Sequence, residues 1–252
     1  MLLKSDFTSC KPGYLTEKSL NRIFGTKNAS FLVGPRTRKK LLILPQSRYV
    51  RIESFDNEYV IKLNLLKGRF GPFIGSNCKI PFSGSAENAV LSYKVLFQAG
   101  FEFVKGGKLP GLGGGAGNSG GEVPTGYDGW SVRFMFKERG TICAYLYHAR
   151  MKGQFGDKLF LRYNGEHVLL NTGSWNTITM SLAMNDPEKD NGIVKVKVNG
   201  IEADELDPVC FRKTADLKID QLFFSCFMGG DDDSYSPGQD QFIMFKDFEI
   251  EY

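Results

Sequence analysis

The feature that most constrains this chain is a series of short runs rich in β-branched, aromatic and leucine residues. These runs extend from about Lys40 to the C-terminus and are separated by clusters of Gly, Pro, Asn and Asp. Runs of this kind predict strands, and the absence of long helical periodicity leaves few helices to cover a parallel sheet. We therefore expect an all-β fold, an antiparallel β-sandwich of the jelly-roll type. The ten expected strands are Tyr49–Ile52, Tyr59–Leu65, Val90–Val104, Trp130–Lys137, Thr141–His148, Leu159–Tyr163, Thr177–Met184, Ile193–Val198, Gln221–Phe227 and Phe242–Glu251.

Length and composition favour one compact unit. The chain has 252 residues, of which 42% are hydrophobic and 24% are charged, and a single large sandwich commonly reaches this length. We expect residues 1–252 to form one domain, with residues 1–30 as an N-terminal extension packed on the sandwich. Within this extension, Thr16–Phe24 is expected to form a short helix that ends at Gly25.

Metal centres, disulfides and membrane spans are not indicated. The five cysteines are odd in number and widely spaced without a C-x-x-C pair, which favours buried free thiols over a disulfide framework or a zinc site. With His148 and His167 as the two histidines, we expect no metal and no cofactor. The longest aliphatic stretch, Leu41–Leu44, is far shorter than the ~20 residues that a membrane-spanning helix needs.

Net charge and the N-terminal residues give only weak indications of the binding partner and the localisation. The net charge of +4 favours an anionic partner, and it does not mark a nucleic-acid binder. The residues after Met1 lack the layout of a signal peptide. A mature secreted protein, a piece of a longer precursor and an intracellular protein would all have such a start, so localisation stays open. We expect a monomer.

The least ordinary segment is residues 105–121, more than half of which are glycine. Phosphate-binding glycine motifs require a helix immediately afterwards, and no helical segment follows here. A flexible linker is the plainer interpretation. Because Lys105, Lys108 and a Leu-Pro-Gly turn lie at its start, we expect instead a ligand-binding loop over Gly106–Gly121 that closes on substrate.

A predicted hairpin gathers polar side chains on one face. Alternation along a strand separates Ser131, Arg133, Met135 and Lys137 from the apolar residues between them. If Lys137 pairs with Thr141, then Arg133 lies opposite Tyr145, and Ser131 lies opposite Tyr147.

Two interpretations of this face are equally weighted. A guanidinium beside a phenol stabilises the phenolate and would bring its pKa closer to neutral, which would suit a catalytic base. The alternative is a solvent-facing sheet surface with no chemistry.

Paired carboxylates, the hallmark of many glycoside hydrolases, are not evident. The alternating acidic residues of Asp247–Glu251 are expected to be the solvent-facing side of the last strand. The run Asp231–Asp233 lacks the ligand spacing of a calcium loop and is expected to be a solvated turn.

Two segments resemble a known family. Tyr93–Phe97 and Gly100–Leu112, the latter containing Gly-Gly-Lys-Leu-Pro-Gly, resemble the signature of family 14 polysaccharide lyases, which include alginate and glucuronan-type lyases. Ser131-x-Arg133-x-Met135 and Tyr145-x-Tyr147 look like the two active-site strands of that family. The resemblance extends weakly from Tyr59 to Phe248, and it is nearest to the catalytic domains of chlorovirus lyases that act on algal cell walls.

The resemblance implies a jelly-roll sandwich with a substrate cleft on its concave sheet. It implies catalysis without a metal, by Lys108, Ser131, Arg133, Tyr145 and Tyr147. Lys105, Gly107 and Lys137 are added as substrate-binding residues. The family often has Trp-Arg after the methionine, whereas this chain has Phe136-Lys137, so the sugar preference at that contact is open.

The implied reaction is β-elimination on a uronate, which leaves an unsaturated sugar. Lys108 and Arg133, with Ser131, would neutralise the carboxylate as charge develops at C5. One tyrosine would remove the C5 proton, and the same or the other tyrosine would protonate the C4 oxygen. The alternatives are a lectin-like carbohydrate-binding module and a glycoside hydrolase on a similar sandwich. Which uronan is cleaved, and whether from the end or internally, stays open.

Overall fold

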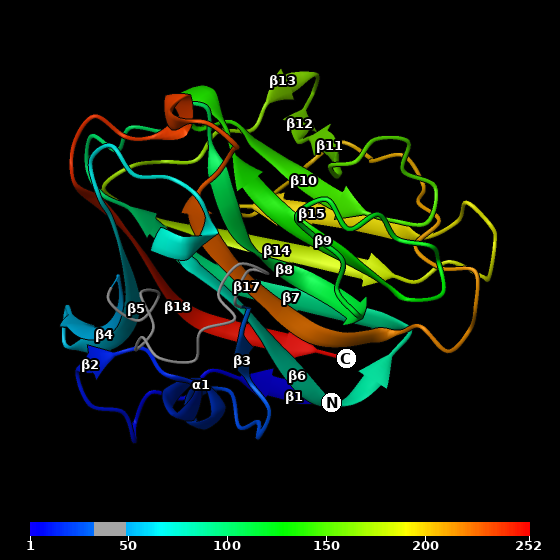
Figure 1. The fold of residues 1–252 in the computed structure, drawn as a ribbon, viewed down its shortest axis with the longest axis horizontal. Helices are drawn as coiled ribbons and strands as arrows, with labels where there is room; N and C mark the ends of the chain where they lie inside the picture. Colours follow the sequence, from blue (N-terminus) through cyan, green and yellow to red (C-terminus); the bar gives the residue numbers. More distant parts are fainter. Residues whose placement is uncertain (33–48) are drawn as a thin grey trace.

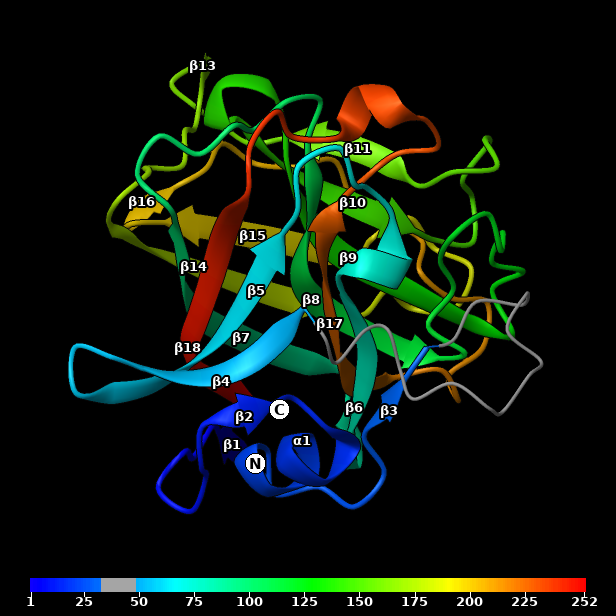
Figure 2. The ribbon, with the colours of Figure 1, turned by 60° about the vertical axis from the view of Figure 1, so that its left-hand side comes forward.

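The computed structural model describes residues 1–32 and 49–252. Two antiparallel sheets lie face to face, as Figures 1 and 2 show, and their facing sides bury one large apolar cluster. The fold is therefore the predicted antiparallel β-sandwich of the jelly-roll type. No helix in the described ranges is long and apolar enough to span a membrane, and the expected aliphatic stretch Leu41–Leu44 lies outside them.

The larger sheet has nine strands, in the order β16-β15-β14-β7-β18-β5-β4-β2, with β1 paired to β18. Their bounds are β1 Leu2–Lys4, β2 Gly13–Tyr14, β4 Val50–Phe55, β5 Glu58–Leu65, β7 Asn88–Phe97, β14 Trp175–Ala183, β15 Ile193–Val198, β16 Ile201–Glu202 and β18 Gln241–Glu251.

The smaller sheet has seven strands, in the order β11-β10-β9-β8-β17-β6-β3. Their bounds are β3 Ser30–Phe31, β6 Ser76–Ala86, β8 Gly107–Gly115, β9 Gly129–Phe136, β10 Ile142–Tyr147, β11 Asp157–Phe160 and β17 Ile219–Met228. A separate pair consists of β12 (Arg162–Tyr163) and β13 (Glu166–His167). Three single-turn 3-10 helices, η2 Pro72–Ile74, η3 Glu138–Gly140 and η4 Asp233–Tyr235, lie in connections.

The N-terminal residues are joined to the sandwich by both packing and strand pairing. Helix α1, Glu17–Ile23, begins after Thr16, whose side chain accepts the Ser19 N–H as predicted for an N-cap. Leu20 and Ile23 are buried in the same apolar cluster as the strands. Figure 1 shows α1 beside β1 and β2, and the two termini lie close together where β1 pairs with β18.

Strand predictions fail mainly where glycine or proline interrupts the pattern. The glycine-rich segment was expected to be a loop, but its first half is β8, a strand in the interior of the smaller sheet. The expected strand Val90–Val104 ends at Phe97 in β7, and the following residues leave the sheet. The expected strand Leu159–Tyr163 is divided between β11 and β12.

Close packing explains why β8 contains so much glycine. A Cβ at Gly111 would lie 2.0 Å from the Val132 carbonyl oxygen and 2.5 Å from the Arg133 Cα. A Cβ at Gly107 would lie 2.3 Å from a ring carbon of Phe136. No side chain fits at either position, so glycine is required even though it weakens a strand.

Candidate active site

The hairpin of β9 and β10 has the predicted register. Arg133 lies opposite Tyr145, and Ser131 lies opposite Tyr147. The Lys137 N–H donates to the Thr141 carbonyl at 2.7 Å across η3, which closes the hairpin.

The two faces of this hairpin also divide as predicted. Val132, Phe134 and Phe136 point into the sandwich core. On the outer face, Met135, Tyr145 and Tyr147 belong to a second, separate buried cluster. This outer face is not an open, solvent-exposed sheet surface, because Arg133 is 3% exposed and Tyr147 is fully buried.

A pocket of about 280 Å³ lies over this outer face. Its lining residues come from strands of the smaller sheet and from four connections around them. The residues that line it are Pro72, Asn77, Lys108, Ser119, Gly120, Arg133, Met135, Tyr145, Tyr147, Phe155, Lys158, Phe227, Gly229, Gly230, Asp231 and Tyr235.

The Arg133 side chain reaches across β8, the strand that separates β9 from β17. Its guanidinium carbon is 4.6 Å from the centre of the Phe223 ring, and its Nη1 donates to Ser225 Oγ at 3.4 Å. Gly111 faces Phe223 in the sheet, so this part of β8 presents no side chain in the path of Arg133. The Arg133 Nε is buried without a hydrogen-bond partner among the described residues.

Lys108 lies beside Arg133 and over one tyrosine. Its ammonium nitrogen is 3.3 Å from the centre of the Tyr145 ring and 2.9 Å from Met135 Sδ. Burial, reinforced by repulsion from Arg133, holds the pKa of Lys108 well below its usual range. An anion in the pocket would favour the charged form of Lys108 and so act against both causes.

The two tyrosine hydroxyls lie 3.5 Å apart. The Gly121 N–H donates to the Tyr147 oxygen at 3.2 Å. Burial, together with the hydrogen bond between the two hydroxyls, raises the pKa of Tyr145 above its usual range, although Arg133 acts in the opposite direction. The expectation that the guanidinium would bring the pKa of this phenol toward neutral is therefore wrong in its net direction, because desolvation outweighs the charge.

The other predicted residues lie beside the pocket and do not line it. Ser131 is fully buried and donates to the Asn118 carbonyl at 2.7 Å. The Lys105 ammonium donates to Ser234 Oγ at 2.7 Å, and the Lys137 ammonium donates to the Lys105 carbonyl. Gly107 is buried within β8, where packing alone explains the glycine.

Several pocket residues were missed by the sequence analysis. Asn77 comes from β6, which was not predicted as a strand, and Phe155 comes from the turn after β10. Lys158 lies opposite Tyr145 on β11, so alternation along that strand could have identified it. Nothing in the sequence pattern indicated Tyr235, which η4 brings to the rim.

Tyr235 borders both lysines that lie outside the pocket. The Lys105 and Lys137 ammonium nitrogens are 5.6 Å and 5.7 Å from the centre of its ring. Its ring packs on Gly230, where a Cβ would lie 2.0 Å from a ring carbon.

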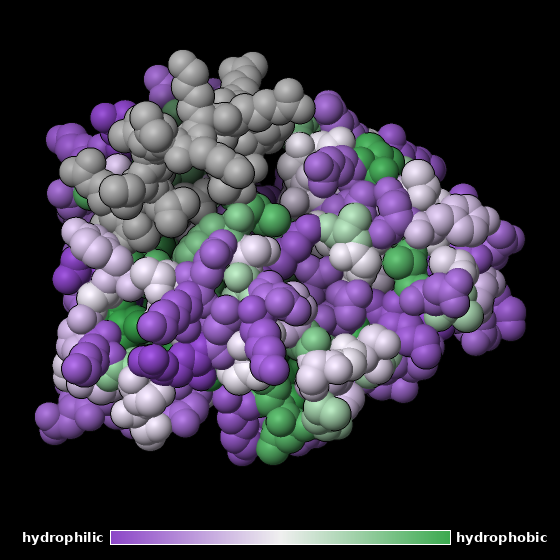
Figure 3. Space-filling view, turned by 60° about the horizontal axis from the view of Figure 1, so that its bottom comes forward, coloured by the Kyte–Doolittle hydropathy of each residue, from purple (hydrophilic) through white to green (hydrophobic). Residues whose placement is uncertain are grey.

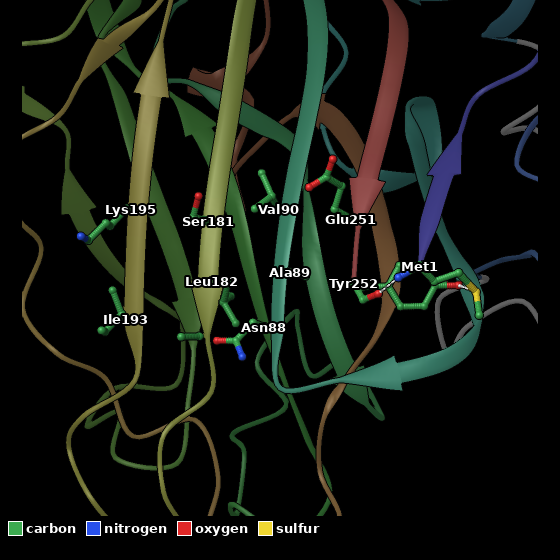
Figure 4. Close-up of a pocket in the computed structure, with 11 residues that line it drawn as sticks. Met1, Asn88, Ala89, Val90, Ser181, Leu182, Ile193, Lys195, Glu251 and Tyr252 are labelled. Carbon is green, nitrogen blue, oxygen red and sulfur yellow. Dashed lines mark hydrogen bonds between the residues drawn. The ribbon is translucent and has the colours of Figure 1, made fainter.

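A larger hollow, of about 520 Å³, lies on the nine-stranded sheet near the chain ends. Figure 4 shows it between Lys195 of β15 and Tyr252, with Val90 and Ser181 on the strands between them. Its lining is mainly aliphatic and contains none of the predicted site residues. The face in Figure 3 is largely hydrophilic, with small separate hydrophobic patches. The smaller pocket therefore contains the residues able to do chemistry.

Metal ligands are not grouped in this part of the chain. Within residues 1–32 and 49–252, no cluster of three or more His, Cys, Asp or Glu side chains could hold an ion. All five cysteines are free and buried, as predicted.

The fold and the pocket together define a β-sandwich whose outer sheet face presents cations and phenols, an arrangement suited to binding an anionic ligand. Residues 72–248 match the family model described as Polysaccharide lyase 14. The chain belongs to this family and is a polysaccharide lyase, as the resemblance implied. A search of curated protein sequences finds no match.

Solved structures with the same fold include three alginate lyases. The alginate lyase Aly36B is 20% identical with a TM-score of 0.79, and the match covers 100% of this chain and 96% of that one. The alginate lyase of Aplysia kurodai is 24% identical with a TM-score of 0.71, covering 81% and 87%. The alginate lyase vAL-1 from Chlorella virus is 23% identical with a TM-score of 0.68, covering 80% and 88%.

Proposed function

We propose that this lyase cleaves a uronate-containing polysaccharide of the alginate or glucuronan type by β-elimination. The observation that carries the proposal is the pair Lys108, which is half-buried, and Arg133, which is buried; both line the pocket without a carboxylate partner among the described residues. Buried cations without counterions are costly, and an anionic ligand would supply what they lack. Aly36B has been solved as a variant with alginate tetrasaccharide, which supports an acidic substrate.

In the proposed reaction, Lys108 and Arg133 bind the uronate carboxylate and stabilise the negative charge that develops at C5. Ser131 assists them by fixing the neighbouring 118–121 segment through its hydrogen bond to the Asn118 carbonyl.

A tyrosine of the pair Tyr145 and Tyr147, in its phenolate form, takes the C5 proton. The C5–H electrons become the C4–C5 double bond, the C4–O bond breaks, and the leaving oxygen is protonated by the same or the other tyrosine. No water is consumed.

Lys105, Gly107 and Lys137 are retained in the proposal as residues that shape or bind substrate next to the pocket. Lys137, tied to Lys105 and close to Tyr235, stands where the family often has arginine. Residues 1–252 act as one catalytic domain in this proposal.

The test is a panel of glucuronan, mannuronate-rich alginate and guluronate-rich alginate, each followed by ultraviolet absorbance of the new double bond. We expect absorbance to rise with at least one polymer. Saturated reducing ends would instead indicate a hydrolase, and binding without cleavage would indicate a lectin-like module. Either result contradicts the proposal.

A further inference from the structure

The turn between β10 and β11, residues 148–156, forms one wall of the pocket and contains residues that the reaction does not use. Phe155 lines the pocket, yet its side chain is 55% exposed. Lys158, at the start of β11, is exposed, lines the pocket and lies opposite Tyr145 in the sheet. An exposed aromatic ring and an exposed cation therefore lie directly beside the proposed catalytic tyrosines.

Side-chain contacts hold this turn in place. His148 Nε2 lies 2.8 Å from Asp157 Oδ2, so the two ends of the turn are joined. At its middle, Arg150 donates to the Glu188 carbonyl at 2.6 Å and pairs with Asp190 at 3.1 Å. The position of Phe155 is thus set by its neighbours, although its ring is open to solvent.

The turn is also packed against the catalytic residues. A Cβ on Gly156 would lie 2.8 Å from two ring carbons of Tyr147, so the backbone of Gly156 rests on that ring. On the other side, Gly121, whose N–H donates to Tyr147, approaches Gln154 and Phe155. Phe155 lines the same pocket as the tyrosines and Gly120, so a ligand that fills the pocket contacts its ring.

The chemistry of these two side chains fits one kind of ligand. An aromatic face packs against the apolar C–H face of a sugar ring, and an ammonium group binds a carboxylate through charge-assisted hydrogen bonds. A uronate carries both features. Within the described residues, Lys158 forms no ion pair, and the nearby Asp157 carboxylate is already joined to His148.

We propose that Phe155 and Lys158 form a second sugar subsite, which binds the uronate next to the one being cleaved. This inference rests on the proposed function, since it takes the substrate to be a uronan. Phe155 provides the platform for the ring, Lys158 binds the carboxylate, and the His148–Asp157 pair holds the turn that carries the platform.

The experiment measures steady-state kinetics and calorimetric binding on alginate and glucuronan oligomers of increasing length. Phe155→Ala and Lys158→Ala should each raise KM and Kd about three- to tenfold for oligomers long enough to reach the subsite. The shortest oligomers that are cleaved should be unaffected, and kcat should hold. Lys158→Ala should also weaken the dependence of KM on salt, because it removes an exposed charge contact.

Matched controls come from the same hairpin. Phe160→Ala removes an exposed ring that contacts His167 and does not line the pocket. Lys152→Ala removes an exposed cation of the same turn that also does not line it. Both controls should behave like wild type, and thermal melting of all four variants checks that they fold.

The outcomes separate the two proposals. If the wild type cleaves a uronan but Phe155→Ala and Lys158→Ala keep wild-type KM at every length, the subsite is wrong and the lyase function stands. If the wild type binds uronan oligomers without cleaving them, the lyase function is wrong, and the effect of the two variants on Kd still decides the subsite. A wild type that binds no uronan overturns both.

Discussion

The outer faces of the two sheets differ in whether their lysine and arginine side chains have carboxylate partners. On the nine-stranded sheet, cations stand beside carboxylates at the surface: Lys94 pairs with Asp247 at 2.9 Å, and Lys62 pairs with Glu53 at 3.0 Å. On the seven-stranded sheet, Arg133 is buried and Lys108 is half-buried, and neither has such a partner in the described part of the chain. Asp247 raises the pKa of Lys94, whereas burial and Arg133 lower that of Lys108.

This difference shows which face is arranged for a ligand. Exposed ion pairs contribute little to stability and need no further explanation. Buried cations without counterions oppose folding, so a sequence that keeps them gains something from them outside folding. The comparison predicts that substitutions of the pocket cations will lower activity strongly without lowering stability. Substitutions of the paired cations on the other sheet should leave activity unchanged and lower stability slightly.

The largest expected effect comes from removing the tyrosine hydroxyls. Tyr145→Phe and Tyr147→Phe keep the rings and their packing, so the variants should fold. At least one should lose about 10²–10⁴ in kcat, because general acid–base catalysis by a placed group is worth that much. Rates of double-bond formation measure the loss, and near-normal kcat in both variants would mean that the patch only binds.

Next come the cations that line the pocket. Arg133→Ala and Lys108→Ala should lower kcat by about 10²–10³, the range seen when one charge-stabilising donor is lost. They should also raise KM, since both residues contact the ground-state carboxylate. Lys94→Ala on the opposite face is the control. Equal losses in kcat/KM for Lys94→Ala and Lys108→Ala would contradict the claim that substrate binds on the outer face of the seven-stranded sheet.

Removing the charge of Lys108 should raise the stability of the folded protein, although it lowers activity. Replacing Lys108 by Met removes a desolvated charge, so Lys108→Met should unfold a few degrees higher than wild type at neutral pH. Lys94→Ala should lose less than about 1 kcal/mol, because its ion pair is exposed.

The advantage of Lys108→Met should depend on pH with a defined sign. The lowered pKa of Lys108 means that the unfolded chain binds more protons between that value and the ordinary lysine pKa. The stability of the wild type relative to the variant should therefore rise as pH increases through this window. Urea unfolding at several pH values measures it, and a constant gap would contradict the assignment.

The smallest effect is proton uptake on binding. An anionic oligomer stabilises the charged form of Lys108 and so raises its pKa, and the complex should take up a fraction of a proton at pH values above the depressed pKa. Calorimetry in buffers with different ionisation enthalpies detects this. Proton release on binding would contradict the predicted sign. A proton uptake that Lys108→Met leaves unchanged would contradict its assignment to Lys108.

The sequence predicted the hairpin well because its information is local. Alternation and a three-residue turn were enough to place Arg133 opposite Tyr145. Burial is not local, and for that reason the direction of the Tyr145 pKa was wrong: the covering segments come from elsewhere in the chain.

The missed strands have a related cause. Strand β8 is rich in glycine, which local propensity counts against a strand, and the neighbours that exclude a Cβ at Gly111 are visible only in the fold. Strand β6 contains Pro81, which normally argues against a strand. It is nonetheless a strand, because the pairing of β3 with its outer edge involves Cys78 and Lys79 and does not include Pro81. Without β6, Asn77 could not be placed in the pocket.

The absence of a side chain at Gly111 has a consequence for how this enzyme could be redesigned. Arg133 lies across a part of β8 that no substitution can fill without displacing backbone. Libraries that vary the floor of the pocket should therefore yield mostly misfolded or inactive clones. The rim should tolerate change far better, since the side chains of Phe155, Lys158 and Asp231 are exposed. Altered polymer preference should be sought by diversifying those rim positions while the glycine strand is kept constant.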